Sequence, residues 1–143
     1  SQPVPQSQED AALLLALADQ VWEGISRAQT LTHRMGSRAR QLSELSADHQ
    51  RALRQLSALY FLLTGQRVPP RQPIRPREAL PLSQALREQY LWGQKWRQTC
   101  LLGGRQAHDG ELRGLLEELA QDGALHGRAI RGVLERMGPP PTP

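Results

Sequence analysis

The stretch Leu42–Leu63, LSELSADHQRALRQLSALYFLL, decides the fold that this sequence predicts. Its apolar and small residues recur at alternating intervals of three and four, which places them on one side of an α-helix. The inward positions are Leu42, Leu45, His49, Ala52, Leu56, Leu59 and Leu63. A helix with such a stripe buries it by packing against other helices, so the stretch predicts one member of a helical bundle.

Three further segments of the chain carry the same spacing. In the last one the inward positions are Leu112, Leu116, Leu119, Gly123, His126, Ile130, Val133 and Met137. In the third they are Leu82, Ala85, Gln89, Trp92, Trp96 and Thr99, and in the first they include Leu13, Leu17, Gln20, Gly24 and Leu31. Four inward stripes predict an all-α fold, an antiparallel four-helix bundle around one core.

Capping residues, glycine and proline mark where the first two helices begin and end. Ser7 followed three residues later by Asp10 predicts a capped start for the first helix. We expect this helix to run to Met35, where Gly36-Ser37 makes a short break. The second helix is expected to end at about residue 63, because Thr64-Gly65 follows.

The second half of the chain is punctuated in the same way. Pro81 suits the first position of the third helix, which is expected to end at about residue 102, before Gly103-Gly104. The fourth helix is expected to start near Asp109 and to stop at Gly138, because three prolines follow. Residues 1–6 are then a flexible lead, residues 7–138 a single domain and residues 139–143 a proline-rich tail.

The connection between the second and third helices is much longer than the other two. Residues 66–81 contain five prolines, which the interior of a helix does not tolerate. A proline-stiffened link of this length can run from one end of a bundle to the other. We therefore expect helices one and two to form one hairpin, helices three and four another, and the link to cross between them.

Composition narrows the class of protein. A chain of 143 residues is long enough for one domain without disulfides, and its single cysteine, Cys100, permits neither a disulfide within the chain nor a cysteine zinc site. The longest apolar run, residues 11–18, is too short to span a membrane, and no basic segment of a signal peptide precedes it. The net charge of +4 is spread along the chain. We expect a cytoplasmic protein that binds no nucleic acid.

The most specific part of the chain resembles the ferritin-like superfamily, and within it the small rubrerythrin-related proteins of bacteria. The segment Ala47-Asp48-His49-Gln50-Arg51-Ala52 leads into Leu59-Tyr60-Phe61-Leu62-Leu63-Thr64-Gly65. The corresponding family pattern is Ala-Asp-Glu-x-x-His, leading into Leu-Tyr-x-x-Leu-Thr-Gly at the end of a helix. The resemblance covers roughly residues 10–137, and it implies a ferritin-like bundle with the long crossover between its second and third helices.

The resemblance also implies where a di-metal centre would lie. The family takes one Glu from each of helices one and three, and a Glu-x-x-His pair from each of helices two and four. The matching positions here are Gln20, His49, Ala52, Gln89, Gly123 and His126. Only His126 keeps the family's residue, and all four carboxylate positions are lost. Because two hard cations need anionic ligands, the site is interpreted as vestigial, with no catalytic, cofactor-binding or metal-ligating residues.

Three functions remain open on this reading. The first is a non-catalytic structural or interaction protein, with a homodimer through the bundle faces as one form. The second is a rubrerythrin-type non-haem oxidoreductase with an unusual ligand set, holding iron or another single metal ion on His49 and His126. The third is a basic helical module that binds an anionic partner. The sequence favours the first, in which His49, His126, Gln20 and Gln89 point inward and form hydrogen bonds to one another, to backbone or to trapped water.

Four acidic residues lie beside the inward positions: Glu23, Asp48, Glu88 and Asp122. A small shift in helix register would turn them inward, where they could supply the missing carboxylates. We expect them instead to lie on the flanks of the helices and to pair with arginine.

Overall fold

The computed structural model describes residues 5–72 and 80–139, and every regular element among them is helical. The elements are α1 Gln6–Met35, a 3-10 segment η1 Gly36–Leu42, α2 Ser43–Thr64, α3 Leu82–Gln106 and α4 Gly110–Met137. The expected all-helical class with four long helices is thus confirmed. The predicted lead and tail, residues 1–4 and 140–143, and residues 73–79 of the predicted crossover link lie outside the described residues.

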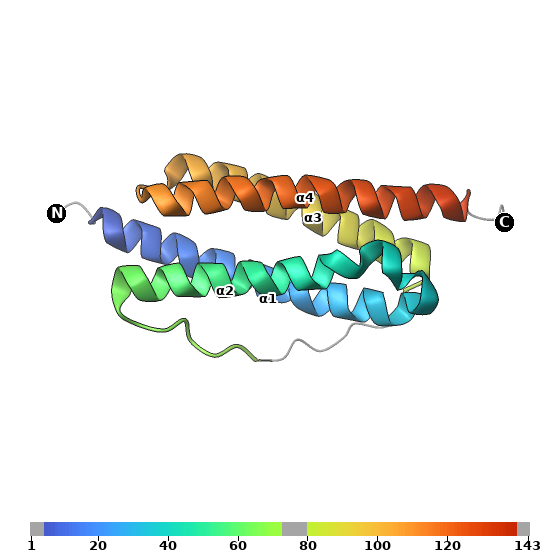
Figure 1. Ribbon diagram of the computed structural model, residues 1–143, viewed down its shortest axis with the longest axis horizontal. Helices are drawn as coiled ribbons and strands as arrows, with labels where there is room; N and C mark the ends of the chain where they lie inside the picture. The colour runs from blue at the N-terminus through green and yellow to red at the C-terminus, as the bar shows by residue number, and fades with distance from the viewer. Residues whose placement is uncertain (1–4, 73–79, 140–143) are drawn as a thin grey trace.

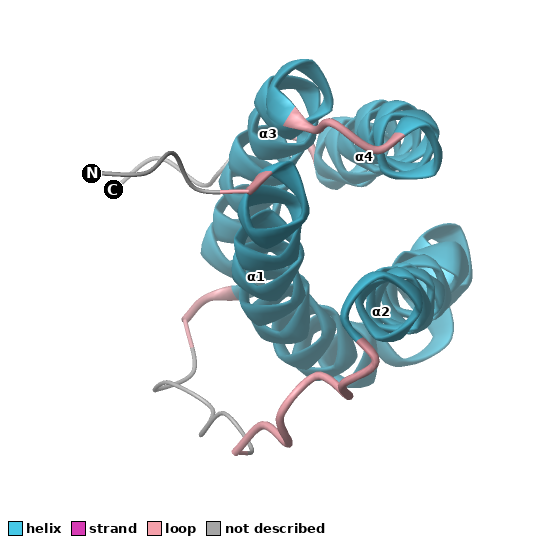
Figure 2. Cartoon of the chain, turned by 90° about the vertical axis from the view of Figure 1, so that its left-hand side faces the viewer, coloured by secondary structure: helices cyan, strands magenta, loops and turns pink. Residues whose placement is uncertain are grey.

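The four helices pack in pairs. α1 packs mainly on α2 and α3 mainly on α4, and the two pairs meet chiefly through α1 and α3. Figure 1 shows α1 and α2 as one pair and α3 and α4 as the other, all with their long axes close to horizontal. The end-on view in Figure 2 places α1 and α3 side by side, with α2 and α4 on the same side of them. The contact between α2 and α4 is less extensive than the contact between α1 and α3.

Three of the predicted helix ends are confirmed, including that of α1 at Met35, and two predicted boundaries are wrong. Gly65 and Gly138 close α2 and α4 with positive φ angles of 73° and 74°, which a residue with a side chain rarely adopts. The predicted break at residues 36–37 is longer, because η1 continues to Leu42 before α2 begins. α3 does not end before Gly103-Gly104 but continues to Gln106.

Gly103 does not end α3, because it lies inside the helix at a close contact with α4 and α1. A Cβ on Gly103 would lie 3.1 Å from a methyl carbon of Leu116 and 3.5 Å from one of Leu13. Gly103 is therefore a packing residue, whose missing side chain lets α3 approach α4 and α1. A glycine that ends a helix and one that admits a neighbour look the same in the sequence.

The predicted cap at the start of the first helix is wrong as well. α1 begins at Gln6 after Pro5, without a side-chain cap. Asp10 is 3% exposed, and its two carboxylate oxygens accept hydrogen bonds from the backbone N–H groups of His108 and Asp109, at 2.9 and 2.8 Å. The side chain thus joins the first turns of α1 to the turn between α3 and α4.

The expected inward stripes of α2 and α4 are largely confirmed. All the expected positions of α2 from Leu42 to Leu59 are buried, as are those of α4 from Leu112 to Val133 except His126, which is partly buried. Met137 is 37% exposed. In α1 the expected positions Leu17, Gly24 and Leu31 are buried. Leu14 and Val21 are fully buried next to the other two expected positions, Leu13 and Gln20, which are only partly buried. In the described part of the chain, no helix combines the length and apolarity needed to cross a membrane.

Candidate functional site

The six positions that the resemblance assigns to a metal centre come only partly together. His49, Ala52 and Gln89 are buried, and the rings of His49 and His126 lie 5.7 Å apart across α2 and α4. Gln20 is only partly buried on α1. Gly123 lies against α3, because a Cβ on it would meet the Cβ of Arg97 at 3.3 Å.

Trp92 occupies the bundle beside the two histidines. The centroid of its ring lies 5.1 Å from that of His49 in an edge-on arrangement, and it stacks on Trp96 at 5.9 Å with planes 14° apart. Across the bundle Trp92 rests on Gly24 of α1, where a Cβ would lie 2.2 Å from an indole carbon. The missing side chain of Gly24 is therefore the space that the indole fills.

Of the expected hydrogen bonds of the four polar side chains, those that would join them directly to one another are not seen in the described residues. Within the described residues, no hydrogen bond joins Gln20, His49, Gln89 and His126 to one another, and His49 Nε2 is buried without a partner. His126 Nε2 lies 2.9 Å from Asp48 Oδ2, although the two groups are not aligned for a hydrogen bond. The two groups form an ion pair when the His126 ring carries a second proton, since charge attraction does not require hydrogen-bond alignment.

Burial and neighbouring charge change the acid–base behaviour of this cluster. Burial, reinforced by His126, lowers the pKa of His49 from 6.5 to about 4, so the ring is neutral at physiological pH. Burial also raises the pKa of the Asp122 carboxyl above its ordinary value, and the nearby carboxylate of Asp48 acts in the same direction. His126 and Arg51 oppose that rise.

Three of the four acidic residues beside the inward positions lie as expected. Glu23 and Glu88 both contact Arg27, at 3.0 and 3.6 Å, and Asp48 pairs with Arg51. Asp122 faces Asp48 and His126 instead of pairing with an arginine within 4 Å in the described part of the chain. The register shift that would turn these carboxylates into the bundle centre is not seen.

The residues present at this level do not fit a di-metal centre. Two imidazoles face each other, but the positions expected to carry carboxylates hold two amides, a histidine and a glycine, and the Trp92 ring packs against His49. Among the described residues, no three His, Cys, Asp or Glu side chains are grouped to hold a metal ion. Chemically, the cluster offers no anionic cage for two cations.

Cys100 gives no nucleophile. It is fully buried in α3, and burial raises the pKa of its thiol to about 12, so the reactive thiolate is not populated near neutral pH.

The sequence reading missed two arrangements. The first is the fit of Trp92 against Gly24, for which the only sequence signal is a glycine inside a strong helical pattern. The second is a groove between α3 and α4 lined by three arginines. The feature of the sequence that could have indicated this groove is the pair Gly123 and Gly127, because two glycines four residues apart let another helix approach closely.

Comparison with known proteins assigns no family. No protein-family model matches the chain, and no curated protein and no solved structure shows significant similarity to it.

Proposed function

We propose that this chain is a non-catalytic interaction protein, built on a ferritin-like antiparallel bundle of rubrerythrin type whose former metal level now serves as structural core. The observation that carries the proposal is Trp92 packed into the space over Gly24. A large aromatic side chain there stabilises the bundle by burial, which a metal centre would otherwise do through its ligands.

The donor chemistry supports the same proposal. A rubrerythrin-type oxidoreductase needs carboxylates that bridge two metal ions, and Gln20, Gln89 and Gly123 bring no charge to the centre. Asp48 and Glu88, which have the required chemistry, contact arginines on the flanks. The enzyme alternative therefore has less support than the interaction protein.

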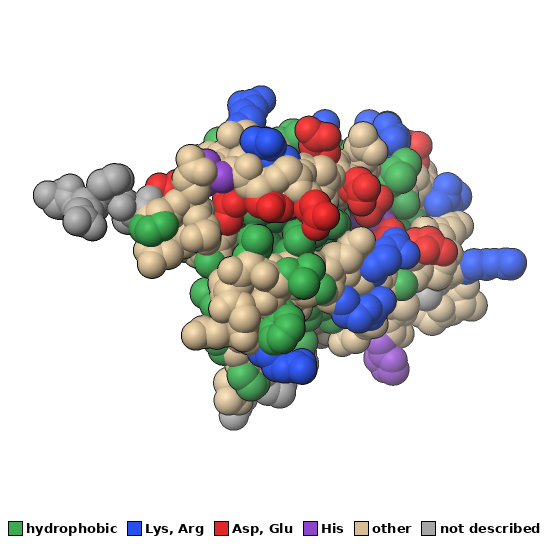
Figure 3. All heavy atoms as spheres, turned by 60° about the vertical axis from the view of Figure 1, so that its left-hand side comes forward, with side chains coloured by type: hydrophobic (Ala, Val, Ile, Leu, Met, Phe, Trp, Pro, Cys, Tyr) green, Lys and Arg blue, Asp and Glu red, His purple; other side chains and the backbone are tan. Residues whose placement is uncertain are grey.

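An interaction protein of this kind would act through its surface. Figure 3 shows a row of acidic side chains beside a patch of apolar ones, on the face of the molecule where the left-hand end of Figure 1 comes forward. On α2, the neighbouring residues Phe61 and Leu62 are 47% and 72% exposed, so they present adjacent apolar surface to a partner. We propose that a homodimer forms through this part of α2.

Elemental analysis of the full chain, purified without chelators and then dialysed against ferrous iron under nitrogen, tests the loss of metal chemistry. The proposal expects well below one iron or manganese per chain, and no peroxidase or ferroxidase turnover above that of buffer. Two tightly held metal ions per chain, lost when His49 or His126 is replaced by Ala, would overturn it and favour the oxidoreductase.

A further inference from the structure

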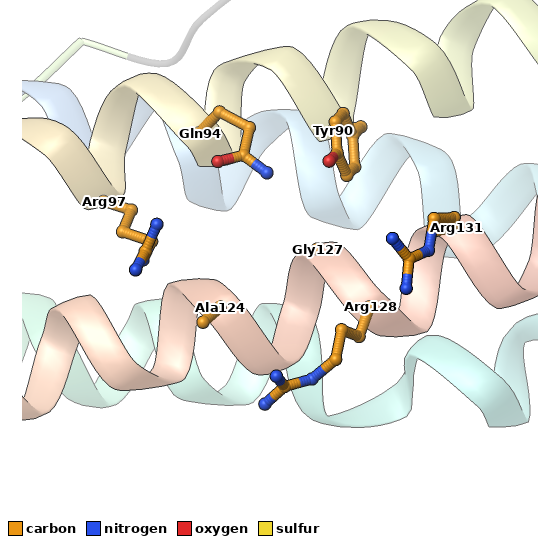
Figure 4. Close-up of a pocket in the computed structure, with 7 residues that line it drawn as sticks. All are labelled: Tyr90, Gln94, Arg97, Ala124, Gly127, Arg128 and Arg131. Carbon is orange, nitrogen blue, oxygen red and sulfur yellow. The ribbon is translucent and has the colours of Figure 1, made fainter.

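The groove between α3 and α4 lies away from the histidine cluster. It has a volume of about 230 Å³, and its lining residues are Tyr90, Gln94, Arg97, Ala124, Gly127, Arg128 and Arg131. In Figure 4 Arg97 and Arg131 reach into the space between the two helices from its two ends, with Gln94 and Tyr90 between them. The guanidinium group of Arg128 extends on the other side of α4, away from α3.

The small residues of α4 form the floor of this groove. A Cβ on Gly127 would lie 3.6 Å from both the Gln94 amide nitrogen and a ring carbon of Tyr90, so these two side chains rest against the bare backbone of α4. One turn earlier, Gly123 lies against the stem of Arg97. The stem is therefore held in place, which lowers the entropy lost when the guanidinium group binds a ligand.

The charge of the groove is unbalanced. It has three guanidinium groups and no acidic lining residue. In the described part of the chain, Arg97 and Arg128 have no carboxylate within 4 Å, and Arg131 has only Glu135 at 3.5 Å, in a pair that is mostly exposed. Exposed pairs of that kind contribute little, so the positive charges of the groove repel one another unless an anion lies between them.

We propose that this groove binds the phosphate group of a small phosphate monoester. Arg97 and Arg131 supply paired N–H donors from opposite helices, and Arg128 adds positive potential from the other side of α4. A monoester carries close to two negative charges at neutral pH, and so it balances the three arginines better than a carboxylate does. Gln94 and Tyr90 can each donate a hydrogen bond to the remaining oxygens.

The size of the groove limits the ligand. Pockets for drug-sized molecules usually measure about 300–1,000 Å³, so this one suits a phosphate with a small organic group beyond it. Through this groove the basic protein would bind one specific anionic partner, and the groove lies apart from the histidine cluster. Its existence does not depend on the loss of the metal centre.

The test is a titration of the full chain with phenyl phosphate and, separately, with inorganic phosphate, at constant ionic strength. Calorimetry measures the affinity, and two-dimensional amide NMR locates the site. We expect saturable binding of one ligand per chain, with shifts concentrated on the Gln94 side-chain amide and the Gly127 backbone amide. Arg97→Gln and Arg131→Gln should each weaken phenyl phosphate about tenfold, the loss of one charge-assisted contact.

Matched variants separate a specific site from general charge attraction. Lys95→Gln removes one positive charge from the exposed side of α3, beside the groove residues, and should change the affinity less than about twofold. Arg97→Lys, which keeps the charge but loses the planar fork, should lie between wild type and Arg97→Gln.

Three results would overturn the proposal. They are equal weakening by Lys95→Gln and Arg97→Gln, binding that does not saturate, and shifts that lie outside the groove. Benzoate serves as the carboxylate comparison, and binding of benzoate as tight as phenyl phosphate would also refute the assignment to phosphate. Because iron analysis plays no part in these measurements, the metal proposal can fail without affecting them.

Discussion

Gly24→Ala is the substitution for which helix propensity and tertiary packing predict opposite signs. In the interior of a helix, Ala is favoured over Gly by about 1 kcal/mol. The added methyl group would, however, lie 2.2, 2.6 and 2.9 Å from three carbons of the Trp92 indole. These distances are far inside van der Waals contact, so either the ring or α1 has to move.

The packing cost should exceed the propensity gain. Overpacking a well-filled core typically costs about 1–3 kcal/mol, and the upper part of that range applies here, because the Trp92 ring is held by His49 and Trp96 on its other sides. The net effect of Gly24→Ala should then be a loss of about 1–2 kcal/mol in the free energy of unfolding.

Gly114→Ala is the matched control, because it makes the same chemical change in another helix. A Cβ at Gly114 meets no heavy atom within 4 Å, so only the propensity acts and the variant should be stabilised by up to about 1 kcal/mol. Urea unfolding followed by far-ultraviolet circular dichroism measures both variants. If Gly24→Ala stabilises the protein as Gly114→Ala does, Trp92 does not fill the space over Gly24.

A double-mutant cycle tests the contact directly. In a Trp92→Leu background, Gly24→Ala should lose most of its destabilising effect, and a cycle that shows no coupling between the two positions would argue against the contact.

The remaining predictions concern other parts of the molecule. Asp10→Ala should lower the free energy of unfolding by roughly 2–4 kcal/mol, because two partly buried backbone N–H groups lose their carboxylate acceptor; a loss below about 0.5 kcal/mol in urea unfolding would contradict this. As the pH falls from 6.5 to about 4, the unfolded chain protonates His49 before the folded one does. The contribution of neutral His49 to the free energy of unfolding is therefore complete above pH 6.5, and it falls by about 3 kcal/mol as the pH drops to about 4. Thermal unfolding of His49→Gln should lack this part of the decline, and a profile identical to that of wild type would refute the burial argument. Leu62→Glu should shift the mass measured by light scattering from dimer to monomer; a monomeric wild-type protein would rule out the proposed dimer.

Local patterns in the sequence were enough to predict the helices. The spacing of Leu42 to Leu59 and of Leu112 to Val133 predicted which faces are buried, because helix periodicity is fixed by backbone geometry. Gly65 and Gly138 marked helix ends correctly, since both adopt the positive φ that only glycine tolerates easily. These conclusions need no knowledge of which helix lies beside which.

The errors arise where one residue type serves two purposes. Gly103 was read as a helix stop, but it admits the side chain of Leu116. Asp10 was read as a local cap, but it binds backbone groups almost a hundred residues away. In both cases the partner is brought close only by the packing of other helices, and no spacing within the chain records that contact.

The candidate sites divide in the same way. The sequence by itself determined that His49 lies on an inward stripe and that Gln20, Gln89 and Gly123 bring no carboxylate to the inward positions. Only the tertiary structure decided that the Trp92 indole packs against Gly24, and that Arg97 and Arg131 line one groove from opposite helices. The physical reason is that periodicity fixes the direction of a side chain around its own helix, whereas the distance between two helices depends on the size of the residues at their contact.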